Sequence, residues 1–282
     1  MERGTLRGCL LHGTYMVNQM RANHELGSLE TLVLGHAYIA AGLLSSQLKG
    51  QDRMALSISC SGPAKGFTVE CSAEGEVRGY LKQEPIPAAD LVDDFDIHDL
   101  FGEGVLSVTK YLQDAKHPFT GKVSLEYGSP AEDLARYFVV SEQTPTAFNL
   151  SVKFDDTGRV LGAGGLFVQA MPNAEEETLG RMEDCVQDLP SIGGLFADGL
   201  SRSEIVQEHL SDFQPVVIGE RRVDFFCPCS KERFARFLAA LPAYEFEDIR
   251  ENGPFPLVTT CLNCNTEYAF SRDEFALLES ER

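Results

Sequence analysis

The stretch "DFFCPCSKERF" (residues 224–234) places two cysteines on either side of one proline, and "TTCLNCNTEY" (residues 259–268) supplies a second pair separated by two residues. The 31 residues between the two pairs are enough for the chain to loop back. Thiolates without histidine suit zinc, and iron–sulfur clusters usually require other spacings. We therefore expect one Zn²⁺ bound by four thiolates, those of Cys227, Cys229, Cys261 and Cys264.

The residues around these pairs, 223–282, predict a small zinc-ribbon-like domain. Ser230 is placed to cap a helix, "SRDE" (271–274) forms a capping box, and Tyr268 and Phe270 lie on one face of a strand. With 11 acidic and 6 basic residues, so short a segment makes a poor independent core. The metal is therefore expected to supply much of its folding free energy.

Residues 1–172 predict an α+β domain in which helices pack against antiparallel strands. Apolar residues at helical spacing favour a helix from Leu29 to about Lys49, capped by Ser28, and a shorter helix over 130–143. Alternating apolar residues and turn signals favour strands at 54–60, 67–71, 75–81, 104–112, 120–128, 148–155 and 163–171.

Between these domains, residues 173–222 carry 11 acidic and 4 basic residues, the strongest charge imbalance per residue in the chain. Amphipathic helices are expected at 173–189 and after the capping box "SRSE" (201–204), with "PSIGGLFADGL" (190–200) interrupting them. Such short helices need a surface to dock on. Two interpretations stay open: a second helical layer of the core, or a linker that can detach.

The composition excludes several classes of protein. A net charge of −19 opposes binding to nucleic acid and to anionic membranes. The most apolar stretch, 32–44, has the length of a core helix and not of a membrane span, and no secretory signal is visible, so we expect a cytoplasmic protein. Eight cysteines then indicate metal or redox chemistry; the solitary ones are expected to be small buried residues: Cys9, Cys60, Cys71 and Cys185.

Catalysis has little support in the sequence, and we do not expect an enzyme. The "GAGG" segment (162–165) lacks the context of a phosphate-binding loop, and "SEQ" (141–143) favours helix-end hydrogen bonding over a catalytic pair. His36 lies on an apolar helix, which is typical of a core residue. The histidines form no nucleophile–base motif: His12, His24, His36, His98, His117 and His209.

Spacing alone leaves the role of the metal open. The four cysteines can simply hold a small fold together. Alternatively, they can form a switch, because bound thiolates are the form that oxidants attack and Cys227 and Cys229 are near enough for a local disulfide with modest backbone movement.

The cysteine pattern, together with "GPAKGFTVECSAEGEVRGYL" (62–81), "FTGKVSLEYG" (119–128), "YFVVSEQTPT" (137–146) and "AGGLFVQAMP" (163–172), resembles the heat shock protein 33 family of redox-regulated chaperones. The resemblance implies an ATP-independent holdase that is inactive when reduced and zinc-bound. It also implies activation by disulfides Cys227–Cys229 and Cys261–Cys264, zinc release, unfolding of the C-terminal region, binding of unfolding client proteins, and a homodimer of the oxidised form.

Two features depart from the family pattern. The segment "NGPFPLVTT" (252–260) is unusually rich in proline, and Cys185 in the expected linker offers an extra oxidation partner, although a buried apolar role suits it better. Two other functions are considered beside the chaperone: a constitutive zinc-ribbon adaptor that binds a protein partner without redox gating, and a nucleic-acid-binding zinc ribbon, which the charge opposes.

Overall fold

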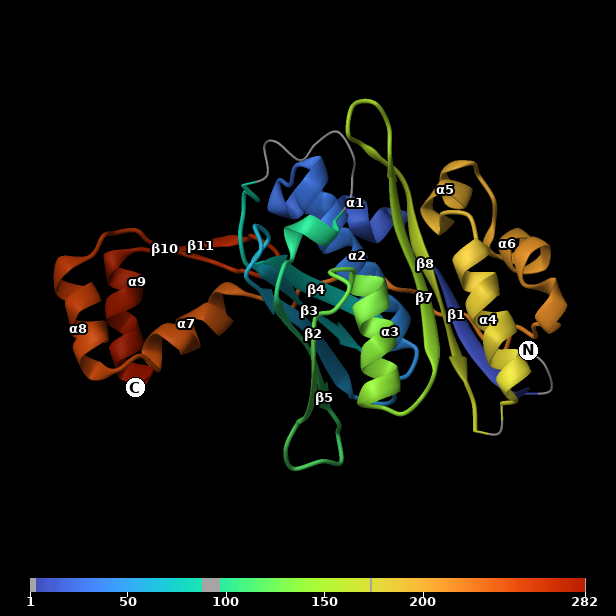
Figure 1. Ribbon diagram of the computed structural model, residues 1–282. Helices are drawn as coiled ribbons and strands as arrows, with labels where there is room; N and C mark the ends of the chain where they lie inside the picture. Colours follow the sequence, from blue (N-terminus) through green and yellow to red (C-terminus); the bar gives the residue numbers. More distant parts are fainter. Residues whose placement is uncertain (1–3, 88–96, 173, 282) are drawn as a thin grey trace. The chain divides into compact units, whose positions relative to one another are not determined.

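A computed structural model describes residues 4–87, 97–172 and 174–281 (Figure 1). The chain divides into two compact units, Met1–Phe226 and Cys227–Arg282. Both units combine helices with antiparallel strands, which confirms the α+β class.

The larger unit contains a six-stranded sheet in the order β6-β5-β2-β3-β4-β9. The pairs are antiparallel except that β9 adds parallel to β4. The last predicted strand of this group ends early, at Ser124, because the amides of Glu126 and Tyr127 donate to the Asp133 carboxylate instead of to a neighbouring strand. The strands are β2 (Arg53–Cys60), β3 (Gly66–Ser72), β4 (Glu76–Leu81), β5 (Gly104–Tyr111), β6 (Phe119–Ser124) and β9 (Asp224–Phe225).

A second sheet has the order β1-β8-β7, with β1 (Leu6–His12), β7 (Thr146–Phe154) and β8 (Val160–Ala170). The hairpin of β7 and β8 was predicted, whereas β1 and the following α1 (Thr14–His24) were not. Strand β1 pairs with β8, more than 150 residues away in sequence. No neighbouring strand or hairpin turn marks it in the sequence, so local patterns did not predict it.

Helix α2 (Ser28–Ser45) forms the centre of the larger unit and contacts strands of both sheets. By length and composition it is the one described helix that could cross a membrane, but most of it is buried inside the protein, as expected for a core helix. Two details of the prediction were wrong. Gly27 is the N-cap residue and Ser28 the first helical one, and the helix ends at Ser45, where turns replace the last helical residues expected up to Lys49.

Helix α3 (Pro130–Val140) begins at the capping residue Ser129 and is shorter than predicted. After its end, one carboxylate oxygen of Glu142 accepts hydrogen bonds from the Tyr137 hydroxyl at 2.7 Å and from Lys110 at 2.5 Å. The "SEQ" segment therefore ties the helix end to β5, as its sequence indicated. A short 3₁₀ helix, η2 (His98–Leu100), precedes β5.

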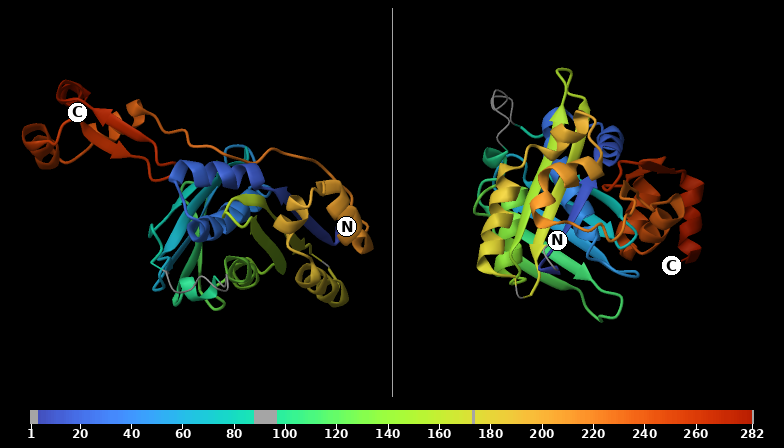
Figure 2. Two further views of the ribbon diagram at one scale, coloured as in Figure 1. Left: turned by 90° about the horizontal axis from the view of Figure 1, so that it is seen from above. Right: turned by 90° about the vertical axis from the view of Figure 1, so that its right-hand side faces the viewer.

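Three helices, α4 (Glu176–Asp188), α5 (Ile192–Ala197) and α6 (Arg202–His209), pack along the face of the β1–β8–β7 sheet that is turned away from α1 and α2 (Figure 1). In the right-hand view of Figure 2 they lie in front of β7 and β8. Their apolar side chains form one cluster with the sheet: Leu6, Leu166, Val168, Met182, Val186, Leu189, Ile192, Phe196, Ile205, Leu210 and Phe213. Strand β8 is thus buried on both faces, which explains its continuous apolar run.

Helix α5 falls where only an interruption was expected. It begins at Ser191, whose hydroxyl caps it, and it approaches β8 very closely. A Cβ atom at Gly162 would lie 2.0 Å from the carbonyl oxygen of Gly193, so only glycine fits there. The glycines of α5, Gly193 and Gly194, would destabilise the helix in isolation, but their lack of a side chain is compatible with this close approach to β8.

The chain then crosses η3 (Ser211–Phe213) and returns to the six-stranded sheet through an extended segment. Val216, Val217 and Ile218 are exposed, Ile218 almost completely at 97%. Arg221 ends this stretch by donating to two backbone carbonyls, Ser45 O at 2.6 Å and Ala73 O at 2.5 Å. The stretch from Val216 to Gly219 is therefore open to solvent, and Glu220 forms an exposed ion pair with Arg202 at 3.2 Å.

The smaller unit contains α7 (Lys231–Ala239), α8 (Ala243–Asn252), α9 (Arg272–Leu277), η4 (Leu278–Glu281) and a hairpin of β10 (Leu257–Thr260) and β11 (Glu267–Phe270). The Ser230 cap and the Ser271–Glu274 capping box are confirmed. Helix α8 and strand β10 were not predicted; β10 follows the prolines of 252–260. The buried apolar core is small: Leu238, Ala239, Phe246, Phe270, Phe275 and Leu278.

Candidate metal centre

Two turns of the smaller unit present the four predicted cysteines. Cys227 and Cys229 precede α7, and Ser230 caps that helix, so the pair is held where the helix begins. Cys261 and Cys264 occupy the turn between β10 and β11. There the amides of Cys264 and Asn265 donate to the Cys261 carbonyl at 3.2 and 2.7 Å, which curls the backbone around the two sulfurs.

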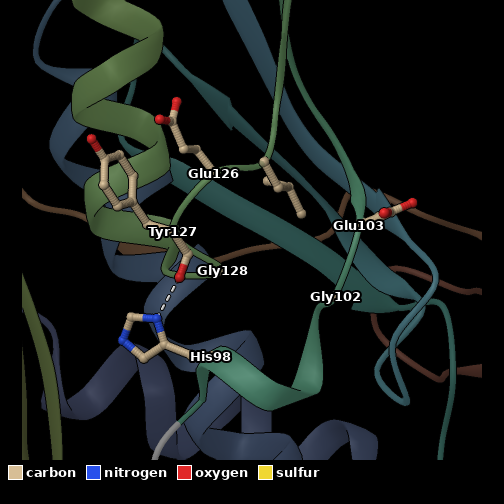
Figure 3. A pocket seen from close by; sticks show the side chains of 7 residues that line it. His98, Gly102, Glu103, Glu126, Tyr127 and Gly128 are labelled. Atoms are coloured by element: carbon tan, nitrogen blue, oxygen red, sulfur yellow. Dashed lines mark hydrogen bonds between the residues drawn. The ribbon is translucent and has the colours of Figure 1, made fainter.

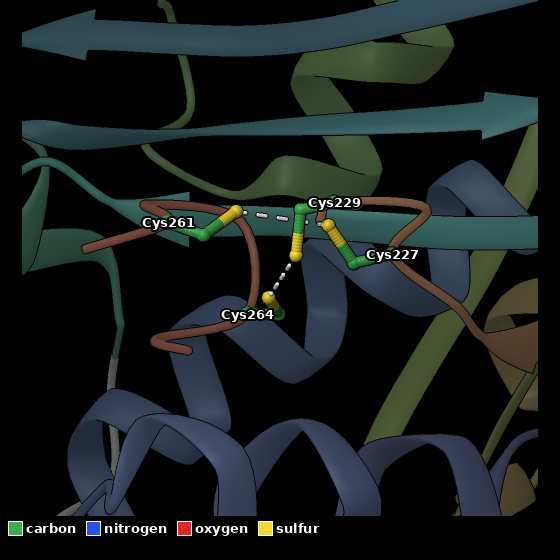
Figure 4. A group of neighbouring side chains, drawn as sticks. All are labelled: Cys227, Cys229, Cys261 and Cys264. Carbon is green, nitrogen blue, oxygen red and sulfur yellow. Dashed lines mark hydrogen bonds between the residues drawn. The ribbon is translucent and has the colours of Figure 1, made fainter. Parts of the chain in front are cut away.

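The four sulfur atoms lie within 4.8 Å of one another (Figure 4). The Sγ atoms of Cys227 and Cys261 are 3.7 Å apart, and those of Cys229 and Cys264 are 3.3 Å apart. A zinc ion with sulfurs at 2.3 Å in a tetrahedron requires sulfur–sulfur distances of about 3.8 Å. The donor atoms and their spacing thus fit a tetrahedral metal ion, and no other group of metal-binding side chains occurs among the described residues.

The cysteines of the second pair are buried, and those of the first are half-buried. Burial, together with the neighbouring sulfurs, raises the pKa of Cys227, and burial raises the pKa of Cys261 to about 11. Burial also acts against ionisation of Cys264, but hydrogen bonding with Thr266 and with the other sulfurs outweighs it and lowers the pKa of that thiol. Cysteine sulfurs bind a metal ion as thiolates, so a divalent cation, which favours the ionised form, is the natural partner of this group.

Sequence reasoning missed the hydroxyl groups beside the sulfurs. The Tyr268 hydroxyl lies 3.1 Å from the Cys229 sulfur, and the Thr266 hydroxyl lies 3.3 Å from that of Cys264. The sequence placed Tyr268 on the correct face of β11, but which sulfur it reaches depends on how the two turns come together.

The solitary cysteines lie apart from this group. Cys71 is buried, as predicted, whereas Cys9, Cys60 and Cys185 are only half-buried. Burial raises the pKa of all four thiols, that of Cys71 to about 12. The Cys185 thiol contacts the His209 carbonyl at 3.6 Å and packs beside the cluster under α4–α6, which supports the apolar role over an extra oxidation partner.

A shallow cavity of about 360 Å³ on the larger unit offers little for catalysis (Figure 3). Of its lining, His98 points toward Tyr127, and its Nδ1 hydrogen-bonds to the Tyr127 carbonyl oxygen, while Glu103 and Glu126 point elsewhere. The described lining residues include no serine, cysteine or lysine as a nucleophile: His98, Gly102, Glu103, Leu125, Glu126, Tyr127 and Gly128.

Known proteins resemble this chain over its whole length. The family model described as Hsp33 protein matches residues 1–271. A 33 kDa chaperonin of Lactiplantibacillus plantarum is 36% identical, covering 95% of this chain and 91% of the relative, and one of Bacillus subtilis is 32% identical, covering 99% and 95%.

Among solved structures, the crystal structure of the 33 kDa chaperonin (heat shock protein 33 homologue) of Thermotoga maritima superimposes with a TM-score of 0.86 at 33% identity. The match covers 99% of this chain and 94% of that one. The family model, the relatives and the solved structure all point to one family. The chain belongs to the heat shock protein 33 family.

Proposed function

We propose that this protein is a redox-regulated, ATP-independent chaperone, a holdase that binds unfolding proteins and prevents their aggregation during oxidative stress in the cytoplasm. The observation that carries the proposal is the cluster of four cysteine sulfurs on a unit with a very small apolar core. Membership of a family whose members are named chaperonins supports it. No enzymatic reaction is part of the proposal.

In the reduced state Cys227, Cys229, Cys261 and Cys264 hold one Zn²⁺ as thiolates. The ion supplies four metal–sulfur bonds, typically about 10–16 kcal/mol in small zinc domains at neutral pH. Among the described residues of this unit, six apolar side chains are buried in its core and a few partly buried ones pack against them, so the four ligands carry a large part of its stability. The unit is therefore folded only while these thiolates stay reduced.

Oxidation joins Cys227 to Cys229 and Cys261 to Cys264. Each disulfide forms when two thiolates give two electrons to peroxide, whose O–O bond breaks and whose oxygens leave as two hydroxide ions, which take protons from the solvent. In the folded unit the short sulfur contacts join Cys227 with Cys261 and Cys229 with Cys264, so proximity there does not select the near-neighbour pairs. Chain connectivity favours them once the unit loosens, because a loop of a few residues costs less entropy to close than one spanning about 35 residues.

The helices α4–α6 supply the second part of the switch. They cover an apolar face of the β1–β8–β7 sheet, and their outer faces are rich in acidic residues that repel one another. We infer that loss of the folded smaller unit releases this segment, residues 173–222, so that its apolar side chains and the sheet face become available to clients. The oxidised form then associates as a homodimer, since newly exposed apolar surface favours self-association.

The test is light scattering of a chemically unfolded client diluted into the purified protein. One sample is zinc-loaded and reduced; the other is first treated with hypochlorous acid, or with peroxide at elevated temperature. The proposal requires that only the oxidised sample suppresses aggregation. Equal suppression by both would mean that the thiols do not gate the surface, and suppression by neither would favour a constitutive zinc-ribbon adaptor.

A further inference from the structure

The four cysteine sulfurs differ in the hydroxyl groups that contact them. Cys229 has the Tyr268 hydroxyl at 3.1 Å, and Cys264 has the Thr266 hydroxyl at 3.3 Å. Within the described part of the smaller unit, no side-chain hydroxyl hydrogen-bonds to Cys227 or Cys261. In each pair, therefore, the second cysteine has a hydroxyl partner and the first has none.

The position of the Tyr268 ring is set without the help of the sulfur. Tyr268 lies on β11, opposite Thr259 of β10, and its ring packs against Phe234 of α7 with centroids 5.1 Å apart. The hydroxyl is thus carried to Cys229 by the hairpin and the helix together. Removing the hydroxyl alone should leave the ring where it is.

The direction of these hydrogen bonds follows from the state of the sulfur. A cysteine that ligates a metal is a thiolate and has no proton to give, so the hydroxyl must donate. A hydrogen bond to a charged acceptor is stronger than one between neutral groups. It stabilises the negative charge and occupies a sulfur lone pair, and both effects slow attack by that sulfur on an electrophile.

Cys229 must act as a nucleophile once, whichever cysteine reacts first with peroxide. If Cys229 attacks, its S–O bond forms, the O–O bond breaks and hydroxide leaves; Cys227 then displaces the second hydroxide to form the disulfide. If Cys227 attacks the peroxide first, Cys229 makes the S–S bond by displacing hydroxide from the Cys227 sulfenic acid. Two electrons pass from the sulfurs to peroxide in both orders. While the smaller unit is still folded, the Tyr268 hydrogen bond opposes the step in which Cys229 attacks.

We propose that Tyr268 and Thr266 are positioning residues that slow oxidation, Tyr268 of the Cys227–Cys229 pair and Thr266 of the Cys261–Cys264 pair. The inference rests on the proposed redox function and deepens it: each pair has its own side chain that sets how much oxidant is needed. The two pairs can then be adjusted separately, although they share one metal ion.

The test measures disulfide formation in the full-length, zinc-loaded protein at a fixed peroxide concentration. Samples are quenched with an alkylating reagent, and mass spectrometry quantifies each disulfide; a chromogenic chelator follows zinc release in parallel. Tyr268→Phe should accelerate the Cys227–Cys229 disulfide at least about tenfold, the smallest change expected for losing one hydrogen bond to a charged group, and should leave the initial rate of the other disulfide within twofold.

Thr266→Val should give the reverse pattern, and Thr266→Ser, which keeps a hydroxyl, should retain the wild-type rate. Tyr244→Phe is the matched control, because Tyr244 is exposed and its hydroxyl donates to Glu245 of the same unit, away from the cysteines. Zinc affinity, measured by chelator competition, shows whether each variant still forms the site. If Tyr268→Phe does not bind zinc, the comparison of Thr266→Val with Thr266→Ser decides the question.

Unchanged rates in both Tyr268→Phe and Thr266→Val would overturn the inference, and so would equal acceleration of both disulfides, which would indicate general loosening of the unit. No client protein enters these measurements. Selective acceleration without any suppression of client aggregation would therefore uphold this inference and overturn the chaperone function. If the oxidised protein suppresses aggregation but the disulfide rates do not depend on the two hydroxyls, the chaperone function stands and this inference is wrong.

Discussion

Two isoleucines of the 173–222 segment offer a direct test of how it is held. Ile192 is the first residue of α5, is fully buried and packs in the cluster with Leu166 and Val168. Ile218 lies in the extended part and is 97% exposed. Replacing each by alanine removes the same atoms, so the two variants differ only in the packing that is lost.

The expected cost follows from the burial. Truncation of a buried isoleucine to alanine destabilises by about 2–5 kcal/mol, because apolar contacts are lost and a cavity remains. The close contact of Gly162 with the Gly193 backbone restricts how far α5 can settle into that cavity. Even about 2 kcal/mol lowers the ratio of docked to undocked segment roughly 30-fold. Ile218→Ala removes no packing and should cost close to nothing.

The assay is hydrogen exchange of residues 176–213 in the reduced, zinc-loaded protein, combined with light scattering of an unfolded client. Ile192→Ala should accelerate exchange in α4–α6 by at least tenfold while strands β2 to β5 stay protected. It should also suppress aggregation partly without oxidant. Ile218→Ala should behave as wild type in both measurements.

Exchange in Ile192→Ala that matches wild type would show that the helices are not held by this cluster. Fast exchange without aggregation suppression would mean that the segment detaches but that the apolar sheet face beneath it does not bind clients. Loss of protection throughout β2 to β5 would mean that α4–α6 belong to the cooperative core, and the interpretation as a detachable linker would be wrong.

Three further outcomes are expected. Removing zinc with a strong chelator should unfold the smaller unit, seen as loss of its amide protection, while the larger unit keeps its thermal transition; an unchanged smaller unit would show that its apolar core suffices. Arg221→Ala should weaken the attachment of the extended segment by about 1 kcal/mol, because two hydrogen bonds from an exposed guanidinium are lost. Proteolysis near 214–220 should increase. An unchanged cleavage rate would show that Arg221 does not hold the segment. Burial lowers the pKa of His36 to about 4, compared with about 6.5 in the unfolded chain. The free energy of unfolding should therefore be unaffected by His36 above pH 6.5 and should decrease as the pH falls toward 4, by at most about 3 kcal/mol. The free energy of unfolding of His36→Gln, measured with urea, should then change less with pH over that interval than that of the wild type. If both proteins lose stability equally as the pH falls, His36 is not the group responsible.

Local patterns in the sequence predicted most of the elements but not all of them. The alternating strands β2 to β5, the β7–β8 hairpin and the capping boxes at Ser201 and Ser271 were found because turn signals and period-two or helical spacing mark them. Strand β1 and helix α5 were missed. The first pairs with a strand far along the chain, and the second contains two glycines and becomes helical only against the sheet.

The candidate site divides in the same way. Cysteine type and spacing were enough to predict the four members of the cluster, because thiolate chemistry and short chain links are properties of the sequence itself. The hydroxyl partners of Cys229 and Cys264 were not predictable, because they depend on the distance between two turns.

By itself, the sequence determined the α+β class, the four-cysteine group and the family, since each is expressed in residue type and in spacing along the chain. Only the tertiary structure decided that α4–α6 cover one face of the β1–β8–β7 sheet, that Arg221 holds the returning segment, and that Tyr268 reaches one particular sulfur. The physical reason is that packing and hydrogen bonding join residues far apart in sequence, and their energies depend on distances that no local pattern encodes.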